Sequence, residues 1–532
     1  MPSQTVELLS PQPQREVPLE QVAIRLHPSD DVAIARQHLP AGQILCVSET
    51  QQITTVQLIP SGHKLALHAI VPGQPIRRYG QVIGFASRAI QPGEHVHTHN
   101  VSVQEFSREY AFSADVRSVD YVPATGRRTF MGYRRADGQV GTRNYVAVIS
   151  TVNCSAHTSR QIAHAFTRER LARYPNVDGV IALTHGSGCA TRTGGEDYVL
   201  LQRVLAGMAA NPNVGACIVV GLGCEANQIS ELVHNYSAVF EDPARPRPGR
   251  PYLTIEDSGG IRKTVQAGIE AVEELLPVVN AAPRTSQPVS ELRVALQCGG
   301  SDGWSGVTAN PLLGMMVDEL VRQGGSAVLA ETPEIYGAEH LLTRRAISRE
   351  VGEKLIERVH WWERYCQVRG LEIDNNPSPG NKAGGLTTIY EKSLGAVAKG
   401  GTTPLVGVYE YAERVTARGF SFMDSPGYDP VSVTGEVAGG CNLVIFTTGR
   451  GSCFGYKPAP SIKICTNTDT YERLIDDMDV NAGRVLEGVS MRQAAGELLD
   501  LVVAVASGQP SKSEAQDVGE AEFVPWSLGG IL

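Results

Sequence analysis

The sequence lacks several features that would assign it to a broad class of protein. None of its 532 residues lie in an apolar run of about 20, the length that a membrane-spanning helix needs. The first residues have neither the basic stretch nor the apolar stretch of a secretory signal peptide, so residues 1–20 are predicted to be a short disordered leader. There is no basic tract and the net charge is −9, so neither nucleic acid nor a membrane surface is an expected partner.

Two kinds of motif are also absent. The ten cysteines show no CxxC spacing and, spread over 532 residues, do not form the dense disulfide framework of a small secreted domain. This predicts a reducing, cytoplasmic location. Neither GxxxxGK[ST] nor a strand-borne GxGxxG is present, so a nucleotide is not the expected ligand. Loop cysteines in a reducing compartment are candidates for metal binding or catalysis, although a cysteine is often only a small buried apolar residue.

The composition, with 42% apolar and 19% charged residues, is that of a globular protein with sizeable cores. Residues 21–104 consist of short β-branched and aliphatic runs separated by turn signals, which predicts a small β-rich domain. Residues 105–128 have no such alternation and are expected to be a linker. From Tyr145 onward, apolar strands alternate with helical patterns. This order predicts an α/β protein with mainly parallel sheets and helices on both faces.

Further local signals divide this α/β part. Asp137-Gly138 predicts a β-hairpin. The polar, proline-containing segment NAAPRTSQPVSE separates one α/β domain (129–285) from a C-terminal α/β domain (286–532). Helices are expected near 196–210, across 338–369 and near 491–507.

The stretch Gln297–Asn310 (QCGGSDGWSGVTAN) follows a predicted strand that ends at Cys298. Its polar, glycine-rich loop carries Ser301 and Asp302. It leads into a helix for which Asn310 is the expected N-cap, with Pro311 at the first position, and Gly324-Gly325 is the expected end of that helix. A loop between a strand and a helix N-terminus is where α/β enzymes often bind ligands.

Four cysteines follow predicted strands and are therefore expected at one sheet edge: Cys154, Cys189, Cys224 and Cys298. His185 and Glu225 lie beside them in the sequence. Such a group suits a transition metal better than an iron–sulfur cluster. The alternative is that each cysteine packs under its loop as a small apolar residue.

Histidines mark the β-rich domain. His63 stands at a strand entrance, and His95, His97 and His99 alternate in EHVHTHN. In a strand, alternate residues share one face, so the three histidines form either a row of metal ligands or an exposed polar face at a strand end.

Two loops offer cations. Residues 375–382 (NPSPGNK with a preceding Asn) end in Asn381 and Lys382, and residues 447–452 (TTGRGS) contain Arg450. A Lys or Arg beside many backbone N–H groups would bind a carboxylate or phosphate, and Asn and Ser suit hydroxyl groups. A polyhydroxylated acid is therefore a reasonable ligand. The alternative is that these residues serve turns and helix caps.

Taken together, CGGSDGWSGVTANP, NPSPGNKAGG, TTGRG, VVGLGCE, GHK and GYRRADGQVGTRN resemble the altronate/galactarate dehydratase family, in order and from about residue 22 to the C-terminus. The resemblance implies that 21–104 is a SAF domain. It also implies a hydro-lyase that converts a hexonate or hexarate to a 2-keto-3-deoxy acid, using a divalent metal such as Fe²⁺ or Mn²⁺. GEHVHTHN and GAEHLL are closer to the altronate branch, whereas YPNVDGV and ISREVGEKL are closer to the galactarate branch.

One loop departs from both branches, because Ser187 in GSGCATRTGG (186–195) stands where an aromatic residue is expected. The exact sugar acid therefore stays open, and so does a lyase acting on another small hydroxy acid, such as a sulfonated one. A sugar-acid-binding protein without catalysis is the non-enzyme alternative. The sequence leaves open whether the chain forms a homo-oligomer.

The resemblance also gives expected roles. His185 is expected as a base, with Glu225 or Asp302 as acid or ligand and Lys382 as a further catalytic residue. Substrate binding is expected from Ser301, Asn310, Asn381 and Arg450. Metal binding is expected from His63, Cys154, Cys189, Cys224 and Cys298.

Overall fold

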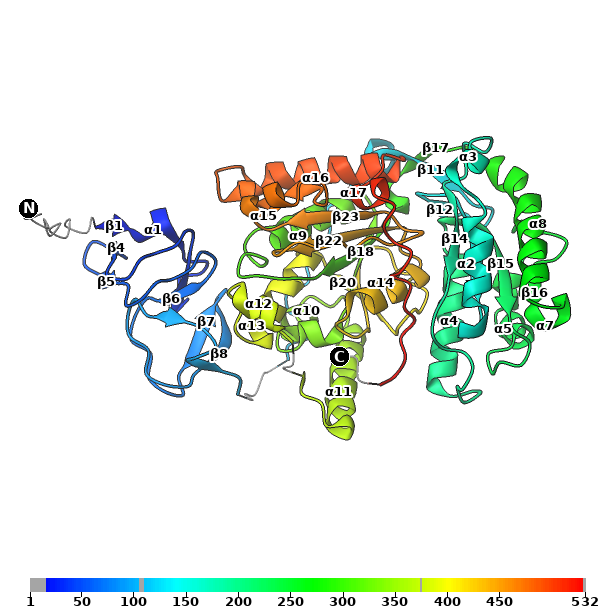
Figure 1. Ribbon diagram of the computed structural model, residues 1–532. Coiled ribbons are helices and arrows are strands. Elements are labelled where there is room, and N and C mark those ends of the chain that lie inside the picture. The colour runs from blue at the N-terminus through cyan, green and yellow to red at the C-terminus, as the bar shows by residue number, and fades with distance from the viewer. Residues whose placement is uncertain (1–15, 105–109, 374–375, 530–532) are drawn as a thin grey trace, which may run out of the picture. The chain divides into compact units, whose positions relative to one another are not determined.

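The computed structural model describes residues 16–104, 110–373 and 376–529, which form two compact units (Figure 1). Unit 1 comprises the chain up to Ser107 together with Pro377–Leu394, and unit 2 comprises Arg108–Asn376 and Gly395–Leu532. Most of the predicted leader and residues 105–109 of the predicted linker lie outside the described residues. No described helix is long and apolar enough to cross a membrane.

Unit 1 is β-rich, as predicted for its N-terminal part. Short strands with alternating buried positions form three small sheets, in the orders β1-β4-β5, β10-β8-β7 and β2-β3-β6-β9. All pairings except β1 with β4 are antiparallel. The elements are β1 (Val17–Pro18), α1 (Leu19–Val22), β2 (Ala23–Ile24), β3 (Val32–Ala35), β4 (Ile44–Cys46), β5 (Gln52–Thr54), β6 (Lys64–Ala66), β7 (Pro75–Arg78), β8 (Gln81–Ala86), β9 (His95–Val96) and β10 (Val101–Ser102).

The segment 377–394 belongs to unit 1 although nearly 270 residues separate it from the rest of that unit. It contains α12 (Pro379–Ala383) and the first part of α13 (Ile389–Val397). Ser378 and Asn381 form a capping box at the start of α12, because each side chain accepts from the other's backbone N–H.

Unit 2 contains a four-stranded parallel sheet in the order β14-β13-β15-β16. Alternate residues of its central strand enter different cores. Val146 and Val148 pack with α2 and α8, whereas Ala147 and Ile149 pack with α4 on the other face. The elements are β13 (Tyr145–Ser150), α2 (Ala156–His164), α3 (Arg168–Leu171), β14 (Gly179–Leu183), α4 (Glu196–Ala210), β15 (Val214–Gly221), α5 (Ile229–Asn235), α6 (Ser237–Phe240), β16 (Tyr252–Thr254), α7 (Ile255–Ser258) and α8 (Ile261–Asn280).

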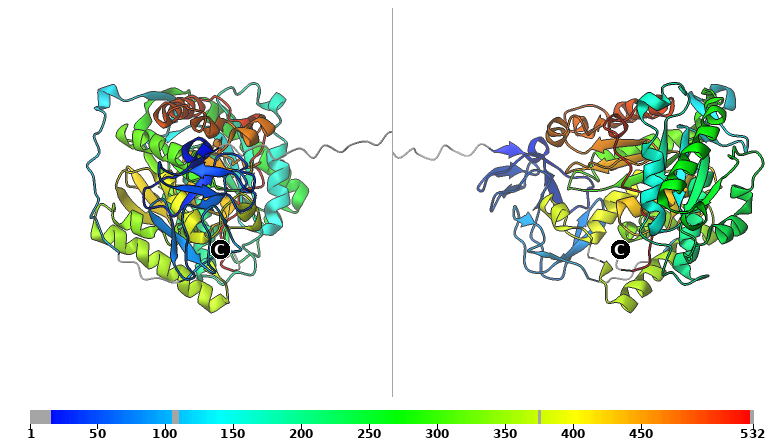
Figure 2. Two further views of the ribbon diagram at one scale, coloured as in Figure 1. Left: turned by 90° about the vertical axis from the view of Figure 1, so that its left-hand side faces the viewer. Right: turned by 45° about the vertical axis from the view of Figure 1, so that its right-hand side comes forward.

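The second sheet of unit 2 has seven parallel strands in the order β20-β21-β19-β18-β22-β23-β24. Helices α9 and α16 lie on one face and α14 on the other (Figure 1, Figure 2). The elements are β18 (Arg293–Cys298), α9 (Ala309–Arg322), β19 (Ser326–Leu329), α10 (Glu339–Thr343), α11 (Arg349–Arg369), β20 (Leu405–Tyr409), β21 (Phe420–Met423), α14 (Asp429–Ala438), β22 (Leu443–Thr448), β23 (Ser461–Cys465), α15 (Thr468–Arg473), β24 (Val480–Asn481), α16 (Met491–Ala506) and α17 (Lys512–Ala515).

The two parallel sheets share a core, because α4 of the first packs on α14 of the second. Buried asparagines reinforce this junction. The Asn211 side chain donates to the carbonyls of Val437 and Cys441 at 2.7 and 2.9 Å, and the Asn213 side chain donates to that of Asn442 at 3.0 Å. The expected fold class, a small β-rich domain followed by α/β regions with mainly parallel sheets, is confirmed.

A third, antiparallel sheet of unit 2 is built from β11 (Thr129–Arg134), β12 (Val140–Gly141) and β17 (Thr285–Pro288). The predicted hairpin is confirmed, since β11 pairs with β12 and Gly138 occupies the turn with φ of 84°.

Two local predictions were wrong. The helix expected across 338–369 is broken between α10 and α11, because Leu405 exchanges backbone hydrogen bonds with Arg345 and Ile347. Asn310 does not cap α9. It lies inside the first turn, where its amide donates to the Gly395 carbonyl at 2.9 Å and accepts from the Thr447 hydroxyl at 2.7 Å, while Thr308 holds the N-cap position. The predicted end of this helix is confirmed at Gly324, with φ of 85°.

Candidate metal centres and active-site loops

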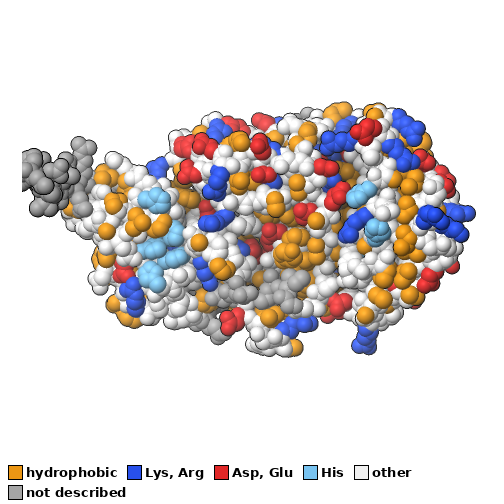
Figure 3. Space-filling view, in the orientation of Figure 1, with side chains coloured by type: hydrophobic (Ala, Val, Ile, Leu, Met, Phe, Trp, Pro, Cys, Tyr) orange, Lys and Arg blue, Asp and Glu red, His pale blue; other side chains and the backbone are white. Residues whose placement is uncertain are grey.

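Three histidines converge in unit 1. His63 precedes β6 and His95 lies on β9, and these strands pair through Leu65 and His95. His63 Nδ1 is 3.0 Å from His95 Nε2, and the His97 ring lies 5.0 Å from that of His63. The three residues offer ligand atoms that all lie within 4.8 Å of one another. Figure 3 shows histidine side chains gathered on the surface of this unit.

The chemistry of this histidine group suits a divalent metal. Burial, assisted by nearby positive charge, lowers the pKa of His63 and His97 to about 4 and that of His95 to about 3. All three rings are therefore neutral near pH 7 and present lone pairs, as metal-binding imidazoles must. Among the described residues, the buried Nδ1 of His97 has no hydrogen-bond partner.

The geometry differs from the expected row on one strand. Only His95–Val96 is extended, and the chain then turns. Asn100 stabilises this turn by accepting from the His97 N–H at 2.8 Å and donating to the His95 carbonyl at 2.9 Å. The turn brings His97 beside His63, and the His99 ring lies 5.6 Å from that of His95.

A buried ion cluster lies directly after His63 in unit 1. The Glu391 carboxylate on α13 accepts from Lys64 at 2.9 and 3.0 Å and from Arg78 at 2.5 Å. Thr387 adds a backbone donor at 2.8 Å and a hydroxyl donor at 2.6 Å. Burial alone would raise the pKa of Glu391, but Lys64 and Arg78 hold it at about 2. This cluster binds the 377–394 segment to the strands of unit 1.

A second group with metal-ligand atoms lies in unit 2, at the end of β18. Cys298, Glu331 and Glu334 offer ligand atoms within 4.8 Å of one another. Lys399 already supplies a cation there, because its Nζ is 3.1 Å from Cys298 Sγ and 3.8 Å from the Glu331 carboxylate. Burial would lower the pKa of Lys399, but the negative groups around it raise that pKa above its ordinary value. A charged lysine makes this group a poorer cation site than the three histidines.

The four cysteines were expected at one sheet edge, but the structure places them in two different sheets. Cys154, Cys189 and Cys224 follow the neighbouring strands β13, β14 and β15, and all three are exposed. Cys298 follows β18 and is buried in the other parallel sheet, because the segment near residue 285 ends the first sheet and the chain then begins a new one.

Three predicted catalytic residues are buried and hold their own loops. Ser187 N–H donates to His185 Nδ1 at 3.2 Å, so the other ring nitrogen donates to the Ser150 carbonyl at 3.0 Å, and burial lowers the His185 pKa to about 4. Glu225 accepts from the Thr151 hydroxyl at 2.8 Å and from the Gly223 N–H at 2.6 Å.

Asp302 is buried within the 297–310 loop. Its carboxylate accepts from the Trp304 N–H at 3.0 Å, the Ser305 hydroxyl at 3.1 Å and the Thr466 hydroxyl at 3.0 Å. Burial raises its pKa. These contacts join the loop to the end of β23.

The predicted substrate-binding residues have varied surroundings. Ser301 and Asn310 are buried in unit 2. Arg450 is exposed, and its backbone N–H donates to the Gly300 carbonyl at 3.0 Å. In unit 1, Asn381 belongs to the capping box of α12, and Lys382 beside it is half-buried.

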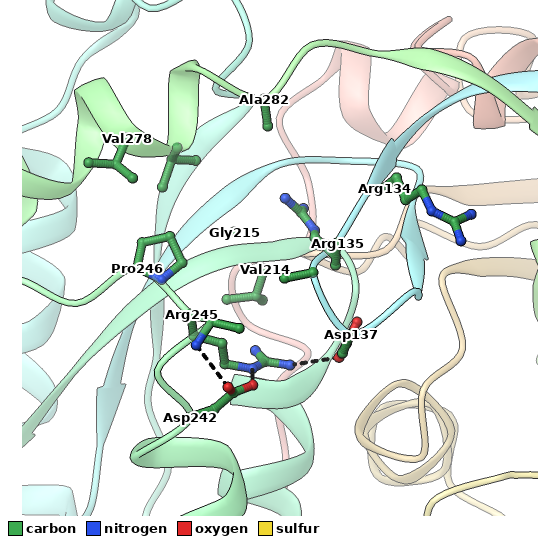
Figure 4. Close-up of a pocket in the computed structure, with 13 residues that line it drawn as sticks. Arg134, Arg135, Asp137, Val214, Gly215, Asp242, Arg245, Pro246, Val278 and Ala282 are labelled. Atoms are coloured by element: carbon green, nitrogen blue, oxygen red, sulfur yellow. Dashed lines mark hydrogen bonds and ion pairs between the residues drawn. The ribbon is translucent and has the colours of Figure 1, made fainter.

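Two hollows of unit 2 differ in their suitability for a sugar acid. One, of about 160 Å³, is lined by residues of β11, β15 and α8 (Figure 4). Its arginines already have partners, since Arg245 pairs with Asp137 and Asp242, and Arg135 donates to Asn144. The other, of about 360 Å³, is lined by the 186–195 loop, including Ser187, Thr191 and Arg192, and by residues 525–527.

Comparison with known proteins gives consistent matches along the chain. Residues 21–104 match the altronate/galactarate dehydratase SAF domain, residues 132–280 the D-galactarate dehydratase/altronate hydrolase second domain, and residues 289–531 the D-galactarate/altronate dehydratase C-terminal domain.

Whole-chain relatives agree with these matches. Altronate dehydratases of Bacillus subtilis (strain 168) and Escherichia coli (strain K12) are 35% and 36% identical, each match covering 93% of this chain and 97% of the relative. Galactarate dehydratase (L-threo-forming) of Escherichia coli (strain K12) is 37% identical, covering 91% of this chain and 93% of the relative. The chain therefore belongs to the altronate/galactarate dehydratase family and is a hydro-lyase.

Proposed function

We propose that this enzyme dehydrates an altronate-type hexonate to a 2-keto-3-deoxy acid, using Fe²⁺ or Mn²⁺ held by His63, His95 and His97. The observation that carries the proposal is the convergence of three neutral imidazoles within 4.8 Å. The relatives support the reaction class, and their nearly equal identities leave the choice of sugar acid to local motifs. The GEHVHTHN element, which contains two of the three histidines, favours the hexonate. Composition and cysteine usage favour the cytoplasm.

The reaction sets clear chemical requirements. A proton α to a carboxylate is weakly acidic, so its removal requires stabilisation of the negative charge that forms on the substrate. A divalent metal supplies Lewis-acid stabilisation of the carboxylate and a hydroxyl oxygen when it is bound. The chain keeps the three ligand rings neutral by burial and fixes His97 through Asn100. The ion cluster around Glu391 fixes the backbone next to His63.

The other predicted residues divide into three groups. Lys382 and Asn381 of unit 1 are proposed to bind a carboxylate and a hydroxyl group of the substrate, because cations and polar donors recognise these groups. Arg450 and Ser301 of unit 2 stay predictions from the sequence. His185, Glu225, Asp302 and Asn310 are proposed to position their loops, since each already makes the hydrogen bonds described above.

The test combines a substrate panel with metal analysis. Purified protein would be incubated with altronate, galactarate or a sulfonated hydroxy acid, each in the presence of Fe²⁺, Mn²⁺ or a chelator. The products measured would be 2-keto-3-deoxy acid and sulfite. We expect kcat/KM for altronate to exceed that for galactarate by roughly tenfold or more, with loss of turnover on chelation and recovery on adding metal. Product from galactarate alone would identify a hexarate dehydratase, and sulfite release would identify a different lyase. No product from any of these acids would refute the proposed substrate.

Variants locate the metal. His63→Ala and His97→Ala should each lose bound divalent metal and turnover together. His68→Ala is the matched control, because this ring of unit 1 is 44% exposed and pairs with Asp31 outside the group. Unchanged metal content and turnover in His63→Ala and His97→Ala would remove the histidines from the site.

A further inference from the structure

The three exposed cysteines of unit 2 lie on loops that are tied together. These loops follow three adjacent parallel strands, with β13 between β14 and β15. The Asn153 N–H, next to Cys154, donates to the Ser187 carbonyl at 3.0 Å. The Asn227 N–H, in the loop of Cys224, donates to the Gly188 carbonyl, next to Cys189, at 3.1 Å. Each loop is therefore held against another by backbone hydrogen bonds.

The loops are also rigid. Glu225 accepts two backbone N–H groups of the Cys224 loop. His185 Nδ1 accepts from the Ser187 N–H within the Cys189 loop, and its other ring nitrogen donates to the Ser150 carbonyl at the end of β13. Gly188 has φ of 100°, and a Cβ there would lie 2.3 Å from the Thr151 carbonyl oxygen. Only glycine allows this approach. The three cysteines are thus carried on a pre-formed surface.

Their exposure needs a reason, because cysteine is among the residue types most often buried. Four cysteines of this chain are exposed, and three of them are Cys154, Cys189 and Cys224. Three clustered, solvent-facing thiols with no apolar packing role are typical of a ligand set.

The spacing distinguishes between one ion and a cluster of ions. Thiolates that share one zinc ion, with Zn–S bonds of about 2.3 Å, lie within about 4 Å of one another. Among the described residues, the three cysteines do not form a group with all ligand atoms within 4.8 Å. An iron–sulfur cluster binds each thiolate through a different iron, so its ligands lie further apart. Three separate loops at one sheet edge fit that arrangement.

We propose that Cys154, Cys189 and Cys224 of unit 2 hold a [4Fe–4S] cluster, with ligands other than the three histidines of unit 1. With three protein thiolates, one iron has no cysteine ligand and takes an oxygen ligand. The hollow of about 360 Å³ lined by Ser187, Thr191 and Arg192 adjoins the Cys189 loop and is large enough for a small hydroxy acid. The proposal does not rest on the substrate proposed above.

Direct chemical analysis tests the cluster. The full chain would be purified without oxygen, and iron, acid-labile sulfide, visible absorption and the electron paramagnetic resonance of the reduced protein would be measured. We expect roughly four irons and four sulfides per chain. Zinc in place of iron, or iron without sulfide, would overturn the proposal with no variant needed.

Variants then identify the ligands. Cys154→Ser, Cys189→Ser and Cys224→Ser should each lower sulfide content at least several-fold, with tryptophan fluorescence reporting whether unit 2 remains folded. Cys453→Ser is the control, because Cys453 is exposed in the same unit but lies outside these loops. Full sulfide content in the three folded variants would refute the assignment. His97→Ala separates the two proposals, because it should lose the divalent ion and keep the sulfide.

Discussion

The ion cluster of unit 1 gives a prediction with a defined magnitude. Glu391 is fully buried and accepts from Lys64, Arg78 and Thr387. Glu391→Gln keeps the size and an acceptor for Thr387 but removes the charge that pairs with two buried cations. Removing one partner of a buried ion pair typically costs about 3–5 kcal/mol, because the remaining charge stays buried without compensation. We expect a loss of this size in the free energy of unfolding of unit 1.

Hydrogen exchange measured by mass spectrometry is the suitable assay. The four tryptophans, Trp304, Trp361, Trp362 and Trp526, all belong to unit 2, so their fluorescence does not report on unit 1. Amides of β6 and β8 that exchange through unfolding of unit 1 should exchange roughly a hundredfold to several thousandfold faster in Glu391→Gln. Peptides from unit 2 and the fluorescence unfolding midpoint should stay unchanged.

The control makes the same chemical change at an exposed position of unit 1. Glu20→Gln alters a solvent-facing side chain of α1 and is expected to change stability by less than about 0.5 kcal/mol. If exchange in Glu391→Gln stayed within threefold of that in Glu20→Gln, the ion cluster would not stabilise unit 1, and the reasoning would be wrong.

Two further predictions concern buried charges of unit 2. Burial raises the pKa of Glu436 to about 8 from its usual 4.5, so the folded state keeps a proton that the unfolded chain loses. The stability from this proton is complete below pH 4.5 and is lost as the pH rises to about 8, at up to roughly 1.4 kcal/mol per pH unit. Glu436→Gln should flatten this pH dependence of the urea midpoint followed by tryptophan fluorescence, and an unchanged slope would contradict the assignment. Lys399→Met should lower that midpoint by the equivalent of about 3–5 kcal/mol, because Glu331 and Glu334 lose their buried cation. A midpoint equal to that of the wild type would show that this cation does not stabilise unit 2.

Periodicity along the chain predicted much of the architecture. The strand ending at Cys298, the helix that stops just before Gly324 and the helices α4 and α16 agree with their expected positions, because their burial follows from local spacing. The break between α10 and α11 was missed because its cause is a backbone pairing with Leu405, about 60 residues later in the sequence. Pairings of that range leave no mark in local spacing.

The candidate sites were predictable in residue type more than in arrangement. The histidines were identified, but a turn rather than a strand brings His97 to His63. Glu391 and Lys399 were missed, since their partners lie roughly 327 and 101 residues away. A signal was present in each case, because Lys64 directly precedes the apolar residues 65–67 and Lys399 follows GAVA. A lone lysine in an apolar run predicts a buried carboxylate partner.

The return of residues 377–394 to unit 1 has a consequence for anyone who divides this chain. The polypeptide passes between the units three times, so unit 1 is not a removable N-terminal piece. Deleting the first 107 residues would leave α12 and the start of α13 attached to unit 2, with Glu391 separated from both of its cations. Conversely, a fragment ending at Ser107 would contain Lys64 and Arg78 without their carboxylate. A fragment of unit 1 meant for structural work would need residues 377–394 joined to it by a designed linker.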